Sequence, residues 1–147
     1  MKKIILCSAL ILSLLLLSFK IAPSKVTIKQ IKIKAPFGTT KINVPDFSKC
    51  KEFIITNFGA VKGDKDKTTQ AIAMAIDEAN KIGGGIVIIP EGEWLTGKIH
   101  FKSNVNLHLN KGALLLFSDN PKDYLPAVHS TWEGLECFNY SPLIYGY

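Results

Sequence analysis

The residues whose types suggest ligand binding are Trp132 and Glu133, in the segment Trp132-Glu133-Gly134. Few strand or helix signals surround this segment, so the sequence predicts that it lies in a long loop. Loops often carry binding sites, and a tryptophan ring offers a flat apolar surface to a ligand. The alternative is a loop tryptophan that packs on the protein surface. Trp132 and Glu133 are therefore the candidate substrate-binding residues.

The sequence predicts neither a metal site nor a phosphate-binding loop. No short metal-ligand spacing connects the three histidines, which are His100, His108 and His129. Cys50 and Cys137 stand far apart, so no metal site is predicted. The glycine run at residues 83–85 follows a predicted helix and lacks the Gly-Lys-Ser/Thr of a phosphate loop. No cofactor is expected.

The composition and the distribution of charge narrow the functional classes. With 147 residues, 47% of them hydrophobic and 20% charged, the chain is able to form a packed core. Residues 1–51 contain ten lysines and one acid, a net +9, whereas residues 52–147 contain eight lysines and eleven acids, a net −3. All 18 basic residues are lysine, and arginine is preferred for recognising bases and phosphates. The sequence therefore predicts no nucleic-acid partner.

The N-terminus predicts export. Two lysines precede an apolar run over residues 4–19, the arrangement of a secretory signal. This run is slightly short for a membrane-spanning helix, which needs about 20 residues. Residues 1–22 are predicted to be a signal peptide cut near Ala22 or Ser18, with an uncleaved anchor as the alternative. We expect a periplasmic or extracellular protein that contacts the membrane only through this segment, if it is uncleaved.

The elements that would position the candidate site begin after residue 22. Residues 26–34 alternate apolar and polar side chains, with a slip at Gln30 that predicts a bulge. Residues 35–48 carry two prolines and a glycine, which predicts an extended linker. A short strand at 53–56 is followed by apolar residues at helical spacing, which predict a helix over 68–82. The candidate N-cap residues are Asp66, Thr68 and Thr69, and the three glycines at 83–85 end the helix.

Short strands recur after the helix, with Gly, Asn or Ser between them. They are predicted at residues 86–89, 95–101, 105–109 and 113–117. This recurrence is typical of a sandwich, a barrel or a β-solenoid. A helix cannot bury its apolar stripe alone, so we expect it to cover the first open end of the strand stack.

Several short motifs follow one another between about residue 35 and residue 147. They are Phe58-Gly59-Ala60, Thr69-Gln70-Ala71-Ile72, Gly83-Gly84-Gly85, Pro90-Glu91-Gly92, Leu95-Thr96-Gly97, Lys102-Ser103-Asn104-Val105, Gly112-Ala113 and Trp132-Glu133-Gly134. In order and spacing this set resembles the N-terminal part of glycoside hydrolase family 28, the polygalacturonases and their relatives. The resemblance implies a mainly β fold: the first coils of a right-handed parallel β-helix, with an N-terminal capping helix and a short N-terminal β segment.

The resemblance also implies a division of the chain. Residues 1–22 are the signal, residues 23–52 an extended lead-in with a β segment, and residues 53–147 the N-terminal cap and first coils. The final apolar run at 142–147 has no turn or cap, so we expect a truncated chain. Cys50 and Cys137 either pair after export or remain free thiols.

The function that the resemblance implies is hydrolysis of α-linked galacturonic acid chains in pectin, with inversion. Inverting enzymes use carboxyl groups about 6.5–9.5 Å apart. The family places them in Asn-x-Asp, Asp-Asp and His-Gly motifs and binds substrate through Arg-x-Lys, and none of the four occurs here. The nearest carboxylate pair, Asp77-Glu78, lies on the predicted helix and is expected to be solvated. No catalytic residue is assigned, and we expect an inactive N-terminal fragment of a glycosidase whose partner is pectin or polygalacturonate.

Two other hypotheses stay open. The first is a non-catalytic β-helix module that binds a polysaccharide or another partner through its loops. The second is a different enzyme on the same fold, such as a pectate lyase or an epimerase. A lyase of this kind would need calcium and would give an unsaturated product that absorbs in the ultraviolet.

Overall fold

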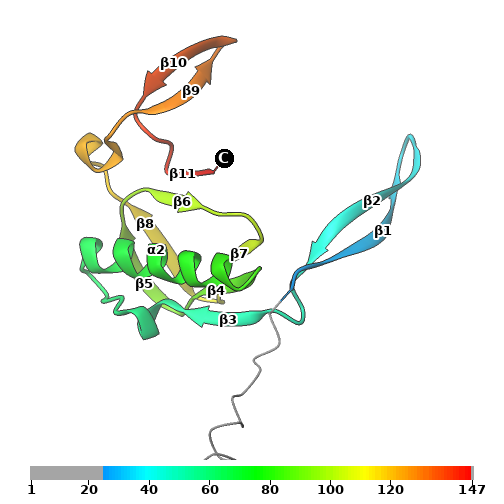
Figure 1. Cartoon of the computed structure of the whole chain (residues 1–147), viewed down its shortest axis with the longest axis horizontal. Coiled ribbons are helices and arrows are strands. Elements are labelled where there is room, and N and C mark those ends of the chain that lie inside the picture. Colours follow the sequence, from blue (N-terminus) through cyan, green and yellow to red (C-terminus); the bar gives the residue numbers. More distant parts are fainter. Residues whose placement is uncertain (1–24, 147) are drawn as a thin grey trace, which may run out of the picture.

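The computed structural model describes residues 25–146, a mainly β structure in which those residues form one α-helix (Figure 1). The predicted signal at residues 1–22 lies outside the described residues. The strands are β1 (Thr27–Ala35), β2 (Gly38–Asp46), β3 (Lys51–Ile54), β4 (Gly85–Ile89), β5 (Gly92–Thr96), β6 (Ile99–Phe101), β7 (Val105–Leu109), β8 (Ala113–Phe117), β9 (Val128–Trp132), β10 (Leu135–Asn139) and β11 (Ile144–Gly146). The helices are the 3-10 helices η1 (Ile55–Phe58) and η2 (Pro121–Tyr124) and the α-helix α2 (Lys65–Lys81). None of the helices in residues 25–146 combines the length and apolar character that crossing a membrane requires.

Three small parallel sheets form the body of the molecule. The chain passes through β4, β5 and β6 in turn, and then returns to pair β7 with β4, β8 with β5 and β11 with β6. Gly85 pairs with Val105 and Gly92 with Ala113, so the first two returns take about 20 residues, whereas the third, from Ile99 to Ile144, takes 45. On the other side of β4, β3 adds a further parallel strand. The predicted strands at 86–89, 105–109 and 113–117 are confirmed.

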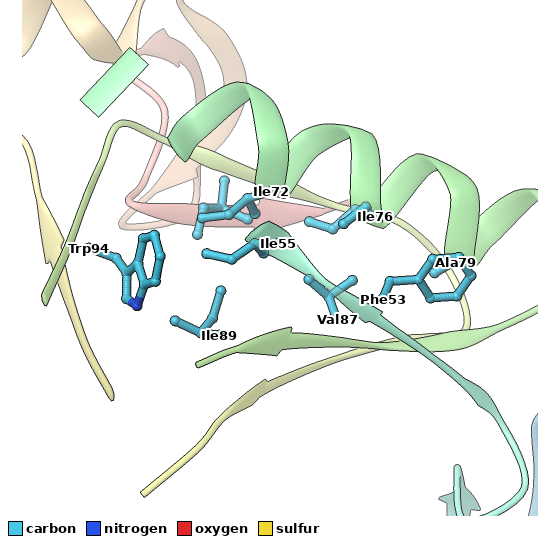
Figure 2. Packing of buried hydrophobic residues seen from close by; sticks show 10 residues of the cluster. Phe53, Ile55, Ile72, Ile76, Ala79, Val87, Ile89 and Trp94 are labelled. Carbon is cyan, nitrogen blue, oxygen red and sulfur yellow. The ribbon is translucent and has the colours of Figure 1, made fainter. Parts of the chain in front are cut away.

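The helix α2 lies along these strands and closes one side of the core (Figure 1). Figure 2 shows Ile72 and Ile76 of α2 among side chains from the strands and η1. The fully buried members of this core include Ile55, Ile72, Ile76, Val87 and Ile89. Burial of one such side chain contributes about 1.5–3 kcal/mol to folding, so this contact is the main source of the helix's stability.

The predicted start of the helix is wrong by one turn. The helix begins at Lys65, and Asp64 is its N-cap because its Oδ1 accepts a hydrogen bond of 3.0 Å from the backbone N–H of Lys67. Asp66, Thr68 and Thr69 lie inside the helix, where the Thr68 hydroxyl donates to Val61 O at 2.9 Å. The predicted end is confirmed: Gly83, with a φ of 91°, follows the last turn.

The strand predicted over residues 95–101 is wrong, because the structure breaks it into β5 and β6. The break lies at Gly97, whose N–H donates to the Thr69 hydroxyl of α2 at 2.7 Å and so takes no part in a strand ladder. The chain turns a corner at this point and enters the next sheet. This corner depends on a contact with the helix, which no local pattern in residues 95–101 reveals.

The linker predicted over residues 35–48 and the bulge predicted at Gln30 are also wrong. β1 and β2 form an antiparallel hairpin in continuous register from Thr27 opposite Asp46 to Ala35 opposite Gly38. The slip in the apolar pattern places Ile28 on the opposite face from Ile31, and Ile28 is simply exposed. This hairpin projects from the body in Figure 1.

Candidate functional site

The predicted site residues Trp132 and Glu133 lie on a second hairpin, formed by β9 and β10, and not in the long loop that the sequence predicts. Trp132 pairs with Leu135 across a two-residue turn. Both turn residues have a left-handed backbone, with φ 49° at Glu133 and φ 86° at Gly134. Such a turn matches the twist of a hairpin. Gly134 is the one residue of this turn that the sequence marks as a turn former, because glutamate is not typical of such a turn.

The β9–β10 hairpin carries an open groove of about 460 Å³. The residues that line the groove are Trp132, Leu135, Cys137, Phe138 and Asn139. Trp132 is 67% exposed, so its ring is available to a flat apolar ligand surface. Glu133 occupies the exposed turn beside the groove and does not line it. The groove residues that the sequence does not predict are Leu135, Cys137, Phe138 and Asn139.

The hairpin face opposite Trp132 carries a long polar contact. His129 Nε2 lies 3.6 Å from Glu136 Oε2, and the His129 ring meets Phe138 edge-on at 5.5 Å between centroids. Phe138 is 75% exposed. The hairpin therefore presents aromatic side chains to solvent over much of its length.

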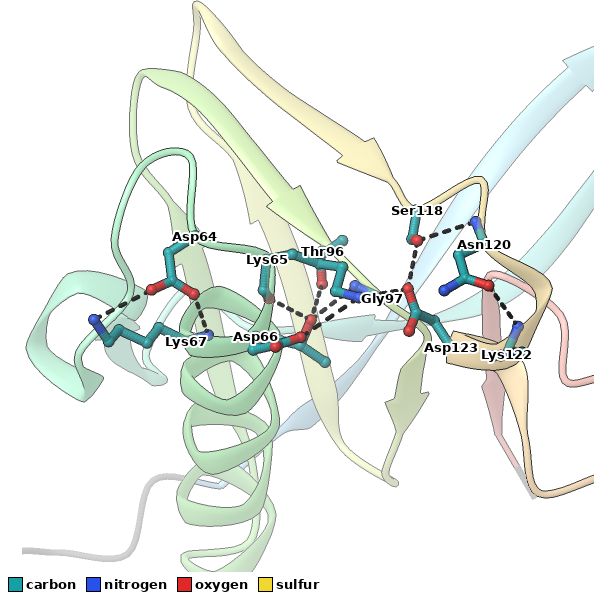
Figure 3. A network of polar contacts seen from close by, with 11 residues as sticks. Asp64, Lys65, Asp66, Lys67, Thr96, Gly97, Ser118, Asn120, Lys122 and Asp123 are labelled. Atoms are coloured by element: carbon teal, nitrogen blue, oxygen red, sulfur yellow. Dashed lines mark hydrogen bonds and ion pairs between the residues drawn. The ribbon is translucent and has the colours of Figure 1, made fainter.

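A network of polar contacts fixes the segment before the hairpin to the start of α2 (Figure 3). Lys65 Nζ lies 2.6 Å from Asp123 Oδ2, and the same oxygen accepts a hydrogen bond from the Ser118 hydroxyl. The Tyr124 hydroxyl donates to the Ser118 carbonyl, and Lys98 Nζ donates to Leu125 O at 2.6 Å. These contacts hold η2 against the body, so the hairpin leaves from a fixed base.

The same network shifts three pKa values. The hydrogen bond from Lys65, followed by that from Ser118, holds the pKa of Asp123 below its ordinary value. The bond to Asp123 in turn raises the pKa of Lys65. Burial of the ring, with the nearby Asp123 charge, raises the pKa of Tyr124. Asp123 and Lys65 therefore form a charged pair at neutral pH, which suits an anchoring contact and leaves no proton to transfer.

The adjacent carboxylates Asp77 and Glu78 form separate surface ion pairs. Asp77 lies 2.7 Å from Lys102, and Glu78 lies 2.8 Å from Lys81. Within the described part of the chain, no group of three or more His, Cys, Asp or Glu side chains is arranged to hold a metal ion. Cys50 and Cys137 are free thiols in the structure, which decides between the two alternatives that the sequence left open.

His100 of β6 and His108 of β7 lie on outer surfaces. His108 is exposed, and so is His100, whose ring stacks on Tyr145 of the neighbouring strand β11 at 4.6 Å with an interplanar angle of 6°. The stack follows from the parallel register, which places His100 opposite Tyr145. Aromatic stacking of this kind stabilises adjacent strands.

Sequence comparison finds relatives of two kinds, a polysaccharide-degrading enzyme and a protein that binds plasmin and fibronectin. It is 38% identical over 86 residues to the exo-poly-α-D-galacturonosidase of Dickeya chrysanthemi, an alignment that covers 58% of this chain and 13% of the relative. It is 37% identical over 101 residues to plasmin and fibronectin-binding protein A of Streptococcus pneumoniae, with 67% of this chain and 12% of that protein covered. No family model matches the chain.

The solved structures that resemble the chain include enzymes of the same kind as the Dickeya chrysanthemi relative. The hyperthermoactive exopolygalacturonase of Thermotoga maritima superposes with a TM-score of 0.60 at 41% identity, covering 65% of this chain and 21% of that one. The chain is polygalacturonase-like. The family 28 exopolygalacturonase of Yersinia enterocolitica also matches this polygalacturonase-like chain, with a TM-score of 0.55 and 29% identity over 83% of it and 22% of that enzyme. The polygalacturonase-like chain thus spans about an eighth of the curated relatives and about a fifth of the solved enzymes.

Proposed function

We propose that the chain is the N-terminal part of an exported glycoside hydrolase that cleaves α-galacturonosyl linkages in pectin with inversion. The observation that carries the proposal is the match to the Thermotoga maritima exopolygalacturonase at 41% identity and a TM-score of 0.60. Sequence identity at this level along a shared backbone supports a common architecture. The apolar run at residues 4–19 supports export.

The architecture we propose is the first coils of a right-handed parallel β-helix, with α2 as its N-terminal cap. The three parallel sheets, each entered again after a full circuit of the chain, support this arrangement. The packing of α2 over Val87 and Ile89 supports the capping role, since a solenoid needs its first apolar layer covered.

We assign substrate contact to the β9–β10 hairpin and none of the chemistry to this chain. Inverting hydrolysis needs an acid and a base on opposite faces of the sugar. The acidic residues at the anchoring network and on α2 are held in ion pairs with lysines. Trp132 is positioned to stack on a sugar ring, and Glu133 to accept hydrogen bonds from its hydroxyl groups. The 147 residues are therefore expected to bind pectic chains without cleaving them.

Two experiments test this proposal. The DNA beyond the codon for Tyr147 should be sequenced and the product of the whole reading frame assayed for reducing ends released from polygalacturonate. A frame that continues through Asn-x-Asp, Asp-Asp and His-Gly motifs and an active product support the proposal. A frame without these motifs, or an inactive product, contradicts it.

The role of the hairpin is tested by W132A. We expect about three- to tenfold weaker binding of oligogalacturonates, because the stacking surface is lost, with no change in the free energy of unfolding. The control is L114A, which truncates an apolar side chain that is 50% exposed on β8, away from both hairpins. Equal affinity for W132A and the unaltered chain would exclude Trp132 from the sugar contact.

A second candidate function is a non-catalytic module that binds a polysaccharide or a protein. The observation in its favour is the 37% identity over 101 residues to the plasmin and fibronectin-binding protein. Exposed apolar residues on the β9–β10 hairpin are consistent with a binding surface. A saturable interaction of the chain with plasmin or fibronectin, together with an inactive product of the whole frame, would favour this candidate.

A further inference from the structure

The β1–β2 hairpin carries a concentration of positive charge that the fold does not require. Its register places Lys32 directly opposite Lys41, and Lys34 lies two residues further along the same face. We call these three residues the cationic face. All three are exposed. Side chains on one face of a strand are about 6.8 Å apart, so the three ammonium groups form a short, closely spaced row.

Nothing within the described residues neutralises the cationic face. No carboxylate of residues 25–146 forms an ion pair with Lys32, Lys34 or Lys41. The one acid of the hairpin, Asp46, alternates onto the other face and accepts a hydrogen bond from the Ser48 N–H at 2.9 Å. Like charges directly opposite one another destabilise a strand pair. The cationic face therefore weakens the hairpin that carries it, which points to a role in binding.

The part of the chain from residue 52 onward has the opposite net charge. Residues 52–147 contain eight lysines and eleven acids, a net −3. A polyanion that approaches this part alone meets a weakly repulsive surface. The hairpin projects away from the body (Figure 1), so its lysines can reach a ligand before the body does.

We propose that the cationic face binds the carboxylates of polygalacturonate and holds the polysaccharide on the protein outside the site of cleavage. This inference rests on the proposed function, because that function supplies the polyanion. Lysine suits the task, since its ammonium is a mobile point charge that follows a flexible row of carboxylates without a fixed bidentate geometry. The attraction depends on ionised carboxylates, so methyl-esterified pectin, which is neutral, is a poor ligand. It weakens with salt.

The test compares two double variants of the full chain with equal net charge. K32Q/K41Q removes the opposed pair, whereas K111Q/K122Q removes two exposed lysines of the body. Binding to polygalacturonate is measured by biolayer interferometry at low salt and at about 0.5 M NaCl. We expect about tenfold weaker binding for K32Q/K41Q and less than about a twofold change for K111Q/K122Q. Thermal unfolding of K32Q/K41Q should occur at the same or a higher temperature, because a repulsion has been removed.

Several results would overturn the inference. These are equal weakening in both variants, no binding by the unaltered chain, or equally tight binding to methyl-esterified pectin. A chain that binds vesicles of phosphatidylserine and phosphatidylcholine but not polygalacturonate would assign the cationic face to a lipid surface. If the product of the whole frame cleaves polygalacturonate while K32Q/K41Q binds it normally, the inference fails and the proposed function stands. If that product is inactive but K32Q/K41Q still binds tenfold more weakly, the proposed function fails and the cationic face remains a polygalacturonate site.

Discussion

Replacing Thr69 by valine should destabilise the corner between β5 and β6. The Thr69 hydroxyl donates its proton to the Lys65 carbonyl at 2.7 Å. It then accepts from the Gly97 N–H at 2.7 Å and from the Thr96 hydroxyl at 3.2 Å. One donor and two acceptor positions are the whole capacity of a hydroxyl, so every one is used. Valine has the same shape and none of this capacity.

The expected loss follows from the two donors that are left without an acceptor. Gly97 is buried and Thr96 is 0% exposed, so neither polar group reaches water easily. An unsatisfied buried donor costs about 1–3 kcal/mol. Thr69 itself is half-buried, which favours the lower end of this range for each donor. With two donors affected, we expect T69V to lose about 2 kcal/mol of unfolding free energy.

Urea unfolding followed by the fluorescence of the buried Trp94 measures this loss. T69S keeps the hydroxyl and should lose less than about 1 kcal/mol, the contribution of one methyl group. T40V makes the same chemical change at an exposed position of β2 and should stay within about 0.5 kcal/mol of the unaltered chain. A T69V loss below about 0.5 kcal/mol, or one equal to that of T69S, would refute the role given to this hydroxyl.

Two further predictions concern backbone space and charge. G84A should lose more than about 2 kcal/mol of unfolding free energy, because a Cβ at Gly84 would lie 2.4 Å from Val26 Cγ2 and 3.0 Å from a backbone oxygen. Gly38 has a similar φ of 139° and no atom within 4 Å of its Cβ position, so G38A should lose clearly less. Urea unfolding of both variants measures the difference. The lowered pKa of Asp123 keeps its carboxylate ionised in the folded chain at pH values where the unfolded chain takes up a proton. The stability from its pair with Lys65 is therefore complete above the ordinary pKa of 3.8 and is lost as the pH falls below it. The difference in unfolding free energy between D123N and the unaltered chain should thus shrink on acidification through this range.

The controls for these predictions are contained in the variants themselves. Equal losses in G84A and G38A would show that the positive φ alone, and not the approach of Val26, sets the cost. A difference between D123N and the unaltered chain that stays constant from neutral pH to pH values well below 3.8 would contradict the assignment of the pair to Asp123 and Lys65.

The sequence predicts correctly those strands and that helix whose residues show a clear apolar pattern between turn-forming residues. The apolar runs ending at Ile89 and Phe117 are bounded by Pro, Gly, Asn or Ser, and both appear as strands. The apolar stripe of α2 is equally clear, because its side chains meet the core at helical spacing. The corner at Gly97 escapes prediction because its hydrogen-bond partner, Thr69, lies 28 residues earlier. The strand β2 escapes prediction because it is largely exposed, so its apolar residues show little periodicity, whereas the alternation over residues 26–34 does predict β1.

The sequence predicts the residue type at the candidate site but not the backbone that positions it. Trp132 stands out by residue type alone, but the turn at Glu133 requires a left-handed backbone that glutamate seldom adopts. The anchoring pair of Lys65 and Asp123 joins residues 58 positions apart. No spacing rule connects such residues, and only the packed fold brings them together.

The chain leaves the parallel sheets after Phe117, at the end of β8, and enters them again at Ile144, where β11 pairs with β6. Residues 118–143 therefore form a module whose length is independent of the register on either side. Doubling such a segment costs only about 0.6 kcal/mol of closure entropy. Related chains can accordingly acquire, exchange or lose a hairpin here while the sheets keep their pairing. Ligand preference at this edge can diversify through insertions and deletions in one segment, while substitutions in the core remain constrained by packing.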